Sequence, residues 1–201
     1  MIKQNYAVNN FNFSTLEQAE LFENIITKNK FNNKQKKIIA SGIKKGLDIS
    51  WYKHNTFGLW QLDSIVIGLQ NNLDPSIYAK SNYSSDIINI IIKGLKNKID
   101  LTNFVEKKFD KYQLEIILDG LINKLDISIY AKTEYSWKQM KQLYKGLILD
   151  LDVSSYANHQ FAPCYMKKIQ DELFIEQYIK GNYFAKKYGE YLDKDYGKIN
   201  E

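Results

Sequence analysis

The sequence predicts an all-α protein, a short α-solenoid of five 26-residue αα-hairpin repeats with a helical cap at each end. Three observations predict this fold. Apolar residues recur along each repeat with the spacing of a helix that buries one face. Only two prolines interrupt the 201 residues, so long helical stretches are possible. One glycine recurs at intervals of 26 residues without insertion, at Gly42, Gly68, Gly94, Gly120 and Gly146.

Residues 1–30 are expected to form an N-terminal capping helix. Ser14 and Glu17 have the spacing of a capping box, in which each side chain bonds the backbone N–H of the other residue. The apolar side chains that follow recur at helical spacing and give this helix one face to bury: Leu16, Ala19, Phe22, Ile25 and Ile26.

Residues 31–172 contain the helical repeats, and each repeat is expected to begin with a long helix. Residues at the helix start mostly carry a side-chain oxygen that can accept a backbone N–H: Asn32, Ser84, Asp110 and Ser136, with Gly58 in one copy. Glutamine follows three residues later in four copies and completes a capping box where the cap is Asn, Asp or Ser: Gln35, Gln61, Gln113 and Gln139.

The recurring glycine falls inside this helix, where it costs about 1 kcal/mol relative to alanine. Its repetition predicts that a neighbouring helix approaches too closely for a side chain. An aspartate after each long helix is expected to cap a second, short helix: Asp48, Asp74, Asp100, Asp126 and Asp152. Each helix pair cannot bury its apolar stripe alone, so we expect neighbouring pairs to stack.

Residues 173–201 are expected to form a C-terminal capping helix and tail, within one continuous structural domain. Glu172 stands where the other copies have glycine, and apolar residues continue at helical spacing through Leu173, Ile175 and Ile179 toward Tyr191. Terminal repeats commonly differ from the inner ones in this way.

The segment from Leu125 to Met140 resembles a known helical repeat, with the approximate pattern L-D-V-S-x-Y-A-x-P-x-F-x-x-x-Q-M-x-x-I-x-x-G-L. That repeat is similar to those of proteins carried by phages and conjugative elements of low-GC bacteria. Thr133 departs from the usual proline and Ile87 from the usual glutamine. The resemblance brings no catalytic residues. It implies a mobile-element setting, in which small inhibitors of host defence, including anti-CRISPR proteins, are common.

Composition argues against several classes of function. Cys164 is the only cysteine, and His54 and His159 each stand alone, so neither a zinc ligand set nor a catalytic base pair is predicted. We therefore expect neither an enzyme nor a cofactor. The apolar run from Ile87 to Leu95 is too short for a membrane span, and the first residues lack the apolar core of a signal peptide. These features favour a cytoplasmic protein.

A partner-binding surface is predicted from positions where one repeat differs from the others. Trp60, Tyr112 and Trp137 stand at helix-start positions that are mostly polar in the other copies. Exposed Trp and Tyr are preferred interface anchors, although local packing is an alternative explanation. The tail residues Tyr183, Lys187 and Tyr188 interleave aromatics with lysine and could grip a partner or cover the last repeat.

The formal charge of +5 is concentrated in residues 1–56, which carry nine lysines against four acids. This patch could face nucleic acid or an acidic protein. The chain has no arginine, which weighs against sequence-specific nucleic-acid readout. The leading hypothesis is thus a protein or ribonucleoprotein partner, and a nucleic-acid-binding module is the alternative. A self-assembling scaffold is a third class, and the oligomeric state is not predicted. The candidate basic residues are Lys34, Lys36, Lys37, Lys44 and Lys45.

Overall fold

The structure is a computed structural model that describes residues 6–52 and 56–180. Helices make up most of this part of the chain, as the sequence predicts. The chain divides into two compact units, Met1–Asn103 and Phe104–Glu201. The division falls within a short helix, α6 (Thr102–Glu106). Each unit is described by itself below.

A β-hairpin that the sequence analysis missed precedes the first helix. Strands β1 (Tyr6–Val8) and β2 (Phe11–Phe13) pair antiparallel, with Tyr6 opposite Phe13. Asn9 and Asn10 connect the strands with φ of 49° and 67°. This left-handed backbone at two consecutive residues is the requirement of a tight hairpin turn, and asparagine tolerates it well. The N-terminal cap is therefore a hairpin and a helix together.

The first helix, α1 (Leu16–Lys28), packs against this hairpin. Phe22 of α1 is fully buried, and its ring centroid lies 5.1 Å from that of Phe13. The predicted cap at Ser14 is wrong by one residue, because Thr15 accepts the hydrogen bond from the Gln18 backbone N–H at 3.2 Å. The Ser14 N–H instead donates to Gln18 Oε1 at 3.3 Å, so Glu17 takes no part in the cap.

The long helices begin at intervals of 26 residues, at the positions that the repeat predicts. In the first unit they are α2 (Asn33–Lys44), α3 (Leu59–Gln70) and α5 (Ser85–Lys96). In the second unit they are α7 (Lys111–Ile122), α8 (Trp137–Ile148) and the longer α9 (Pro163–Lys180). The side chains of Asn32, Ser84, Asp110 and Ser136 cap four of these helices, as predicted.

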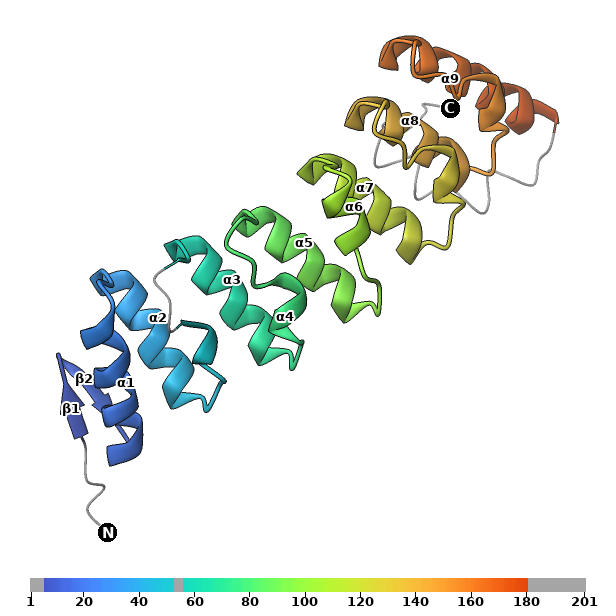
Figure 1. Cartoon of the computed structure of the whole chain (residues 1–201). Coiled ribbons are helices and arrows are strands. Elements are labelled where there is room, and N and C mark those ends of the chain that lie inside the picture. The colour runs from blue at the N-terminus through green and yellow to red at the C-terminus, as the bar shows by residue number, and fades with distance from the viewer. Residues whose placement is uncertain (1–5, 53–55, 181–201) are drawn as a thin grey trace. The chain divides into compact units, whose positions relative to one another are not determined.

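The short elements follow the recurring aspartates. They are η1 (Ser50–Tyr52) and α4 (Pro75–Tyr78) in the first unit, and η2 (Ile127–Ile129) and η3 (Val153–Ser155) in the second. In the first unit α3 packs between α2 and α5, and α4 contacts both α3 and α5 (Figure 1). In the second unit α8 packs between α7 and α9, while η2 and η3 lie against α7 and α8.

Three of the recurring glycines, Gly68, Gly120 and Gly146, accommodate a tyrosine at the end of the short element that follows the helix. A Cβ at Gly68 would lie 2.7 Å from Tyr78 Cε2, and one at Gly120 would overlap the hydroxyl of Tyr130. Both tyrosines are fully buried. Close approach is therefore the reason for the glycine, as predicted, but an aromatic side chain makes it. At Gly94 the obstacle differs, since a Cβ there would lie 2.9 Å from the Ile99 carbonyl oxygen.

The glutamines of the capping boxes also join successive repeats within each unit. Each Oε1 accepts the N–H of its cap residue, while each Nε2 donates to a backbone carbonyl 22 residues later. In the first unit the Nε2 atoms of Gln35 and Gln61 lie 3.2 Å and 2.6 Å from the carbonyl oxygens of Phe57 and Tyr83. In the second unit Gln113 and Gln139 reach the carbonyls of Tyr135 and Phe161 at 2.7 Å and 2.8 Å. We call these four residues the glutamine clamps.

The hydrophobic core of each unit lies between its long helices. Several apolar side chains at the helical spacing are at most 1% exposed, namely Leu62, Ile65, Ile88 and Ile91 in the first unit and Leu114, Ile117 and Leu118 in the second. Leu16, expected on the buried face of the first helix, is instead 52% exposed. Such burial contributes about 25 cal/mol per Å² of apolar surface, which is the main stabilising contribution in a small helical unit.

Candidate binding surface

The second residue of every long helix is exposed. Trp60 is 72% exposed and Tyr112 is 48% exposed, whereas other copies place Lys34, Asp86 and Lys138 at the same position of the repeat. Two large aromatic rings therefore occupy positions that need no apolar side chain for packing. Their exposure agrees with the comparison of repeats, and their role in binding stays a prediction.

In the first unit, Trp60 shares its side of α3 with a second exposed apolar residue. Ile67 is 41% exposed and follows Trp60 by seven residues, which is about two helical turns. Lys34 and Lys37 lie on the neighbouring helix α2, at the repeat positions of Trp60 and Asp63, and both are exposed. Packed helices lie about 8–10 Å apart, so these lysines flank the tryptophan. We call Lys34, Lys37, Trp60 and Ile67 the Trp60 face.

The predicted basic patch lies mainly on α2, which contains four lysines and no acidic residue. Lys34, Lys37, Lys44 and Lys45 are exposed, and Lys36 is half-buried. The Lys44 Nζ lies 5.5 Å from the centroid of the Phe13 ring, a cation–π distance that ties the end of α2 to the hairpin.

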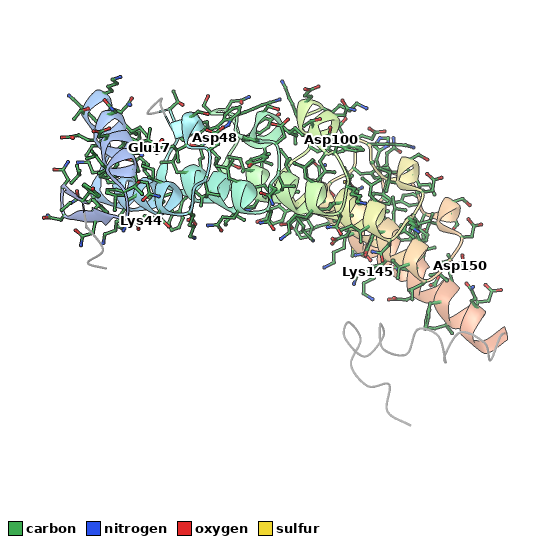
Figure 2. All side chains as sticks on the ribbon, turned by 90° about the horizontal axis from the view of Figure 1, so that it is seen from below. Glu17, Lys44, Asp48, Asp100, Lys145 and Asp150 are labelled. Atoms are coloured by element: carbon green, nitrogen blue, oxygen red, sulfur yellow. The ribbon has the colours of Figure 1, made fainter. Side chains whose placement is uncertain are left out.

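The recurring aspartates of the first unit lie away from this patch. Figure 2 shows Lys44 on one side of this unit and Asp48 and Asp100 on the opposite side. The Oδ1 atoms of these aspartates accept backbone N–H bonds from Ser50 and Thr102 at 2.9 Å and 2.8 Å. These aspartates thus have the capping role that their recurrence predicts, and the acidic residues on the long helices of this unit are Asp63 of α3 and Asp86 of α5.

In the second unit, the rings of Tyr112 and Trp137 contact each other in a tilted arrangement. Their ring centroids are 5.3 Å apart with an interplanar angle of 33°. The Nζ of Lys111 lies 5.1 Å from the Tyr112 ring centroid, and the Nζ of Lys138 lies 5.6 Å from that of Trp137. Trp137 is half-buried, since Tyr112 covers part of it. Tyr112 is therefore exposed, as expected of an interface anchor, whereas local packing accounts for part of the Trp137 side chain.

The aspartate turns of the second unit carry perturbed carboxyl groups. Hydrogen bonds from the side chain and backbone of Ser128 lower the pKa of Asp126, and those from Ser154 lower the pKa of Asp152. Both aspartates cap the 3₁₀ turn that follows them. These shifts have a local structural cause and do not require a ligand.

Several sequence-predicted residues lie outside the described residues: Tyr183, Lys187 and Tyr188 of the tail, and His54. His159 is exposed, and its ring centroid lies 6.3 Å from that of Tyr135. Cys164 is also exposed. Among the described residues, no group of three His, Cys, Asp or Glu side chains has the arrangement of a metal site.

Two features of this surface were missed at the level of sequence. Ile67 is exposed although apolar residues occupy much of α3, and its position seven residues after Trp60 was the available signal. The ring contact between Tyr112 and Trp137 joins residues 25 apart, one fewer than the repeat length. This contact could be predicted by aligning each repeat with the next, because the first residues of neighbouring long helices lie side by side.

The chain matches no family model, no curated protein and no solved structure. Within residues 6–52 and 56–180, no helix is long and apolar enough to cross a membrane.

Proposed function

We propose that this chain is a non-enzymatic binding protein whose five hairpin repeats stack into a short α-solenoid and dock on a protein or ribonucleoprotein partner. The observation that carries this proposal is the exposure of Trp60, a residue that is 72% exposed at a position filled by Lys34 and Asp86 in the adjacent helices. Tryptophan side chains are mostly buried in folded proteins, and tryptophan is among the residues most enriched as energetic anchors of interfaces.

The resemblance of the repeat to those of phage and conjugative-element proteins supports a more specific form of this proposal. In that form, the chain acts in the bacterial cytoplasm and inhibits a defence protein or ribonucleoprotein, as anti-CRISPR proteins do. A surface that binds without chemistry suits such an inhibitor, because occupying a partner's functional surface requires no turnover.

The proposal is tested by affinity capture from bacterial lysate, with and without nuclease, followed by mass spectrometry. The wild-type chain is compared with Trp60→Ala and with Asp86→Ala, a matched variant at the same repeat position. We expect one dominant partner that survives nuclease treatment and is retained by Asp86→Ala. Loss of an interface anchor costs about 2 kcal/mol or more, so Trp60→Ala should weaken capture about 30-fold. Capture of no protein by the wild type would refute the proposal.

A second candidate function is nucleic-acid binding through α2, and the four lysines of this helix favour it. Lysine holds phosphates as a point charge, and such binding weakens steeply with salt. This function predicts that naked DNA or RNA binds at low salt and is released when Lys34, Lys36 and Lys37 are replaced by alanine. Recovery of nucleic acid alone from the lysate, lost with nuclease, would place this function first.

A further inference from the structure

We infer that the Trp60 face binds an acidic protein segment that carries two apolar anchors, with its carboxylates directed toward α2. This inference rests on the proposed binding function and names the chemistry of the partner. Trp60 and Ile67, the two exposed apolar residues of this face, are seven residues apart on α3. Seven residues of α-helix rise about 10 Å, so the two exposed side chains present a pair of apolar contacts at that spacing on one side of α3. An amphipathic helix with apolar residues at i and i+7 has the same spacing.

The apolar pair distinguishes a protein partner from a nucleic acid. A nucleobase can stack on Trp60, and base–aromatic stacking is a common mode of single-strand binding. Ile67 has no planar face for a base, and a phosphate backbone offers no apolar group to cover its side chain. A protein segment can bury both residues, since each apolar anchor removes a comparable area from water.

The charges around the pair define the polarity of the partner. The three long helices of this unit carry six lysines against Asp63 and Asp86, a net charge of +4. Lys34 and Lys37 are exposed on the α2 side of Trp60, whereas Asp86 is exposed on the α5 side and Asp63 is exposed on α3 itself, between Trp60 and Ile67. A partner segment therefore binds most tightly when its carboxylates lie on the edge that faces α2. Carboxylates on the edge that faces Asp86 weaken its binding. This asymmetry fixes the orientation of the segment as well as its charge.

The inference is tested with synthetic peptides and the full chain. The probe is a fluorescein-labelled amphipathic peptide of about five helical turns, with two leucines seven residues apart and glutamates along one flank of that pair. A second peptide replaces every glutamate by lysine, and a labelled single-stranded oligothymidylate provides the nucleic-acid arm. Binding is followed by fluorescence anisotropy at two salt concentrations.

We expect the glutamate peptide to bind at least tenfold more tightly than the lysine peptide. Trp60→Ala and Ile67→Ala should each weaken its binding about tenfold or more, and Lys37→Glu should weaken it several-fold. Lys141→Glu is the matched control, because Lys141 is exposed at the same repeat position in α8 and the helix that follows, α9, has Cys164 at the position of Trp60. This control should leave the affinity unchanged. Urea unfolding of each variant shows that these exposed substitutions leave the fold intact.

Three results would overturn the inference: equal affinity for the two peptides, equal effects of Lys37→Glu and Lys141→Glu, or binding of the oligothymidylate alone. The lysate experiment separates this failure from that of the proposed function. A partner captured equally by wild type and Trp60→Ala leaves the binding function standing and refutes the Trp60 face. Capture of no protein refutes both.

Discussion

Replacing Gln113 by methionine tests whether the glutamine clamps hold successive repeats together. Methionine has a similar length and flexibility but can neither accept nor donate the clamp's hydrogen bonds. The substitution removes the bond from the Asp110 N–H to Oε1, at 2.8 Å, and the bond from Nε2 to the Tyr135 carbonyl, at 2.7 Å. Gln113 is only 8% exposed, so water does not readily replace these partners.

The expected loss follows from these two bonds. Each hydrogen bond contributes about 1 kcal/mol net, and a buried carbonyl left without its donor costs about 1–3 kcal/mol more. The apolar side chain of methionine should offset only part of this loss of stability, because the side chain at position 113 is already buried. We expect the free energy of unfolding to fall by about 2–3 kcal/mol, measured by urea denaturation followed by far-UV circular dichroism.

The matched control is methionine at Gln142, a half-buried glutamine of α8 that is not one of the clamps. It should change the free energy of unfolding by less than about 0.5 kcal/mol. If Gln113→Met were equally mild, the clamp would contribute nothing to stability and the reasoning would be wrong.

A glutamate at position 113 gives a further check through pH. Its carboxylate would keep the acceptor for the Asp110 N–H but would face the Tyr135 carbonyl oxygen from a buried site, so its pKa should rise in the folded state. The native state would then bind more protons than the unfolded state, whose glutamate pKa is about 4.3. The penalty should therefore be greatest near neutral pH and should shrink as the pH falls toward 4. Gln113→Met should show no such recovery.

Three further predictions concern the repeat that contains this clamp. Gly120→Ala should destabilise the chain by about 1–3 kcal/mol in urea unfolding, despite the better helix propensity of alanine, because its Cβ would overlap the Tyr130 hydroxyl; adding Tyr130→Phe should recover part of the loss. Lys124→Gly should stabilise the chain by about 0.5–1 kcal/mol in the same assay, since Lys124 has a left-handed φ of 57° at the end of α7. Asp126 has a folded-state pKa below its ordinary value of 3.8 because of its bonds with Ser128, so its contribution is present above that pH and is lost as the pH falls below it. Asp126→Asn should reduce this acid-induced loss of stability when urea midpoints are compared between pH 6 and the most acidic pH at which the chain folds.

Repetition made most of the helical structure predictable. A single helix start is uncertain within a few residues, but five copies in one register place each start at the same position. The caps at Asn32, Ser84, Asp110 and Ser136 were predictable for the same reason, and so was the close approach at the recurring glycines. The identity of the approaching group was not, because periodicity shows that space is missing without showing which side chain fills it.

The N-terminal region lacks this repetition, and the prediction there was less accurate. The hairpin of β1 and β2 has only three residues in each strand, too few for an alternating pattern to stand out. Its signal was the pair Asn9–Asn10 between apolar residues, which is typical of a tight turn. Ser14 and Thr15 are adjacent and each has a hydroxyl group that can cap a helix. The position of the preceding hairpin determines which of the two is the N-cap.

The candidate surface was predictable only in part. The unusual aromatics were visible as departures from the repeat, and the structure places Trp60 and Tyr112 in solvent. Whether such a ring is exposed or covered depends on which residue the neighbouring helix places beside it. Trp137 meets Tyr112, whereas Trp60 has Lys34 and Asp86 at the equivalent positions of its neighbours. That difference arises from three-dimensional packing and not from the local sequence.

The glutamine clamps have a consequence for how such a chain can change during evolution. Each clamp ends on a main-chain carbonyl, which every amino acid supplies, and the residues that provide it here are two phenylalanines and two tyrosines. A duplicated or exchanged module that keeps its own glutamine can therefore join its new neighbour without a compensating mutation there. The outward-facing positions, freed from holding the modules together, can vary one repeat at a time, so new recognition surfaces can arise while the joints stay the same.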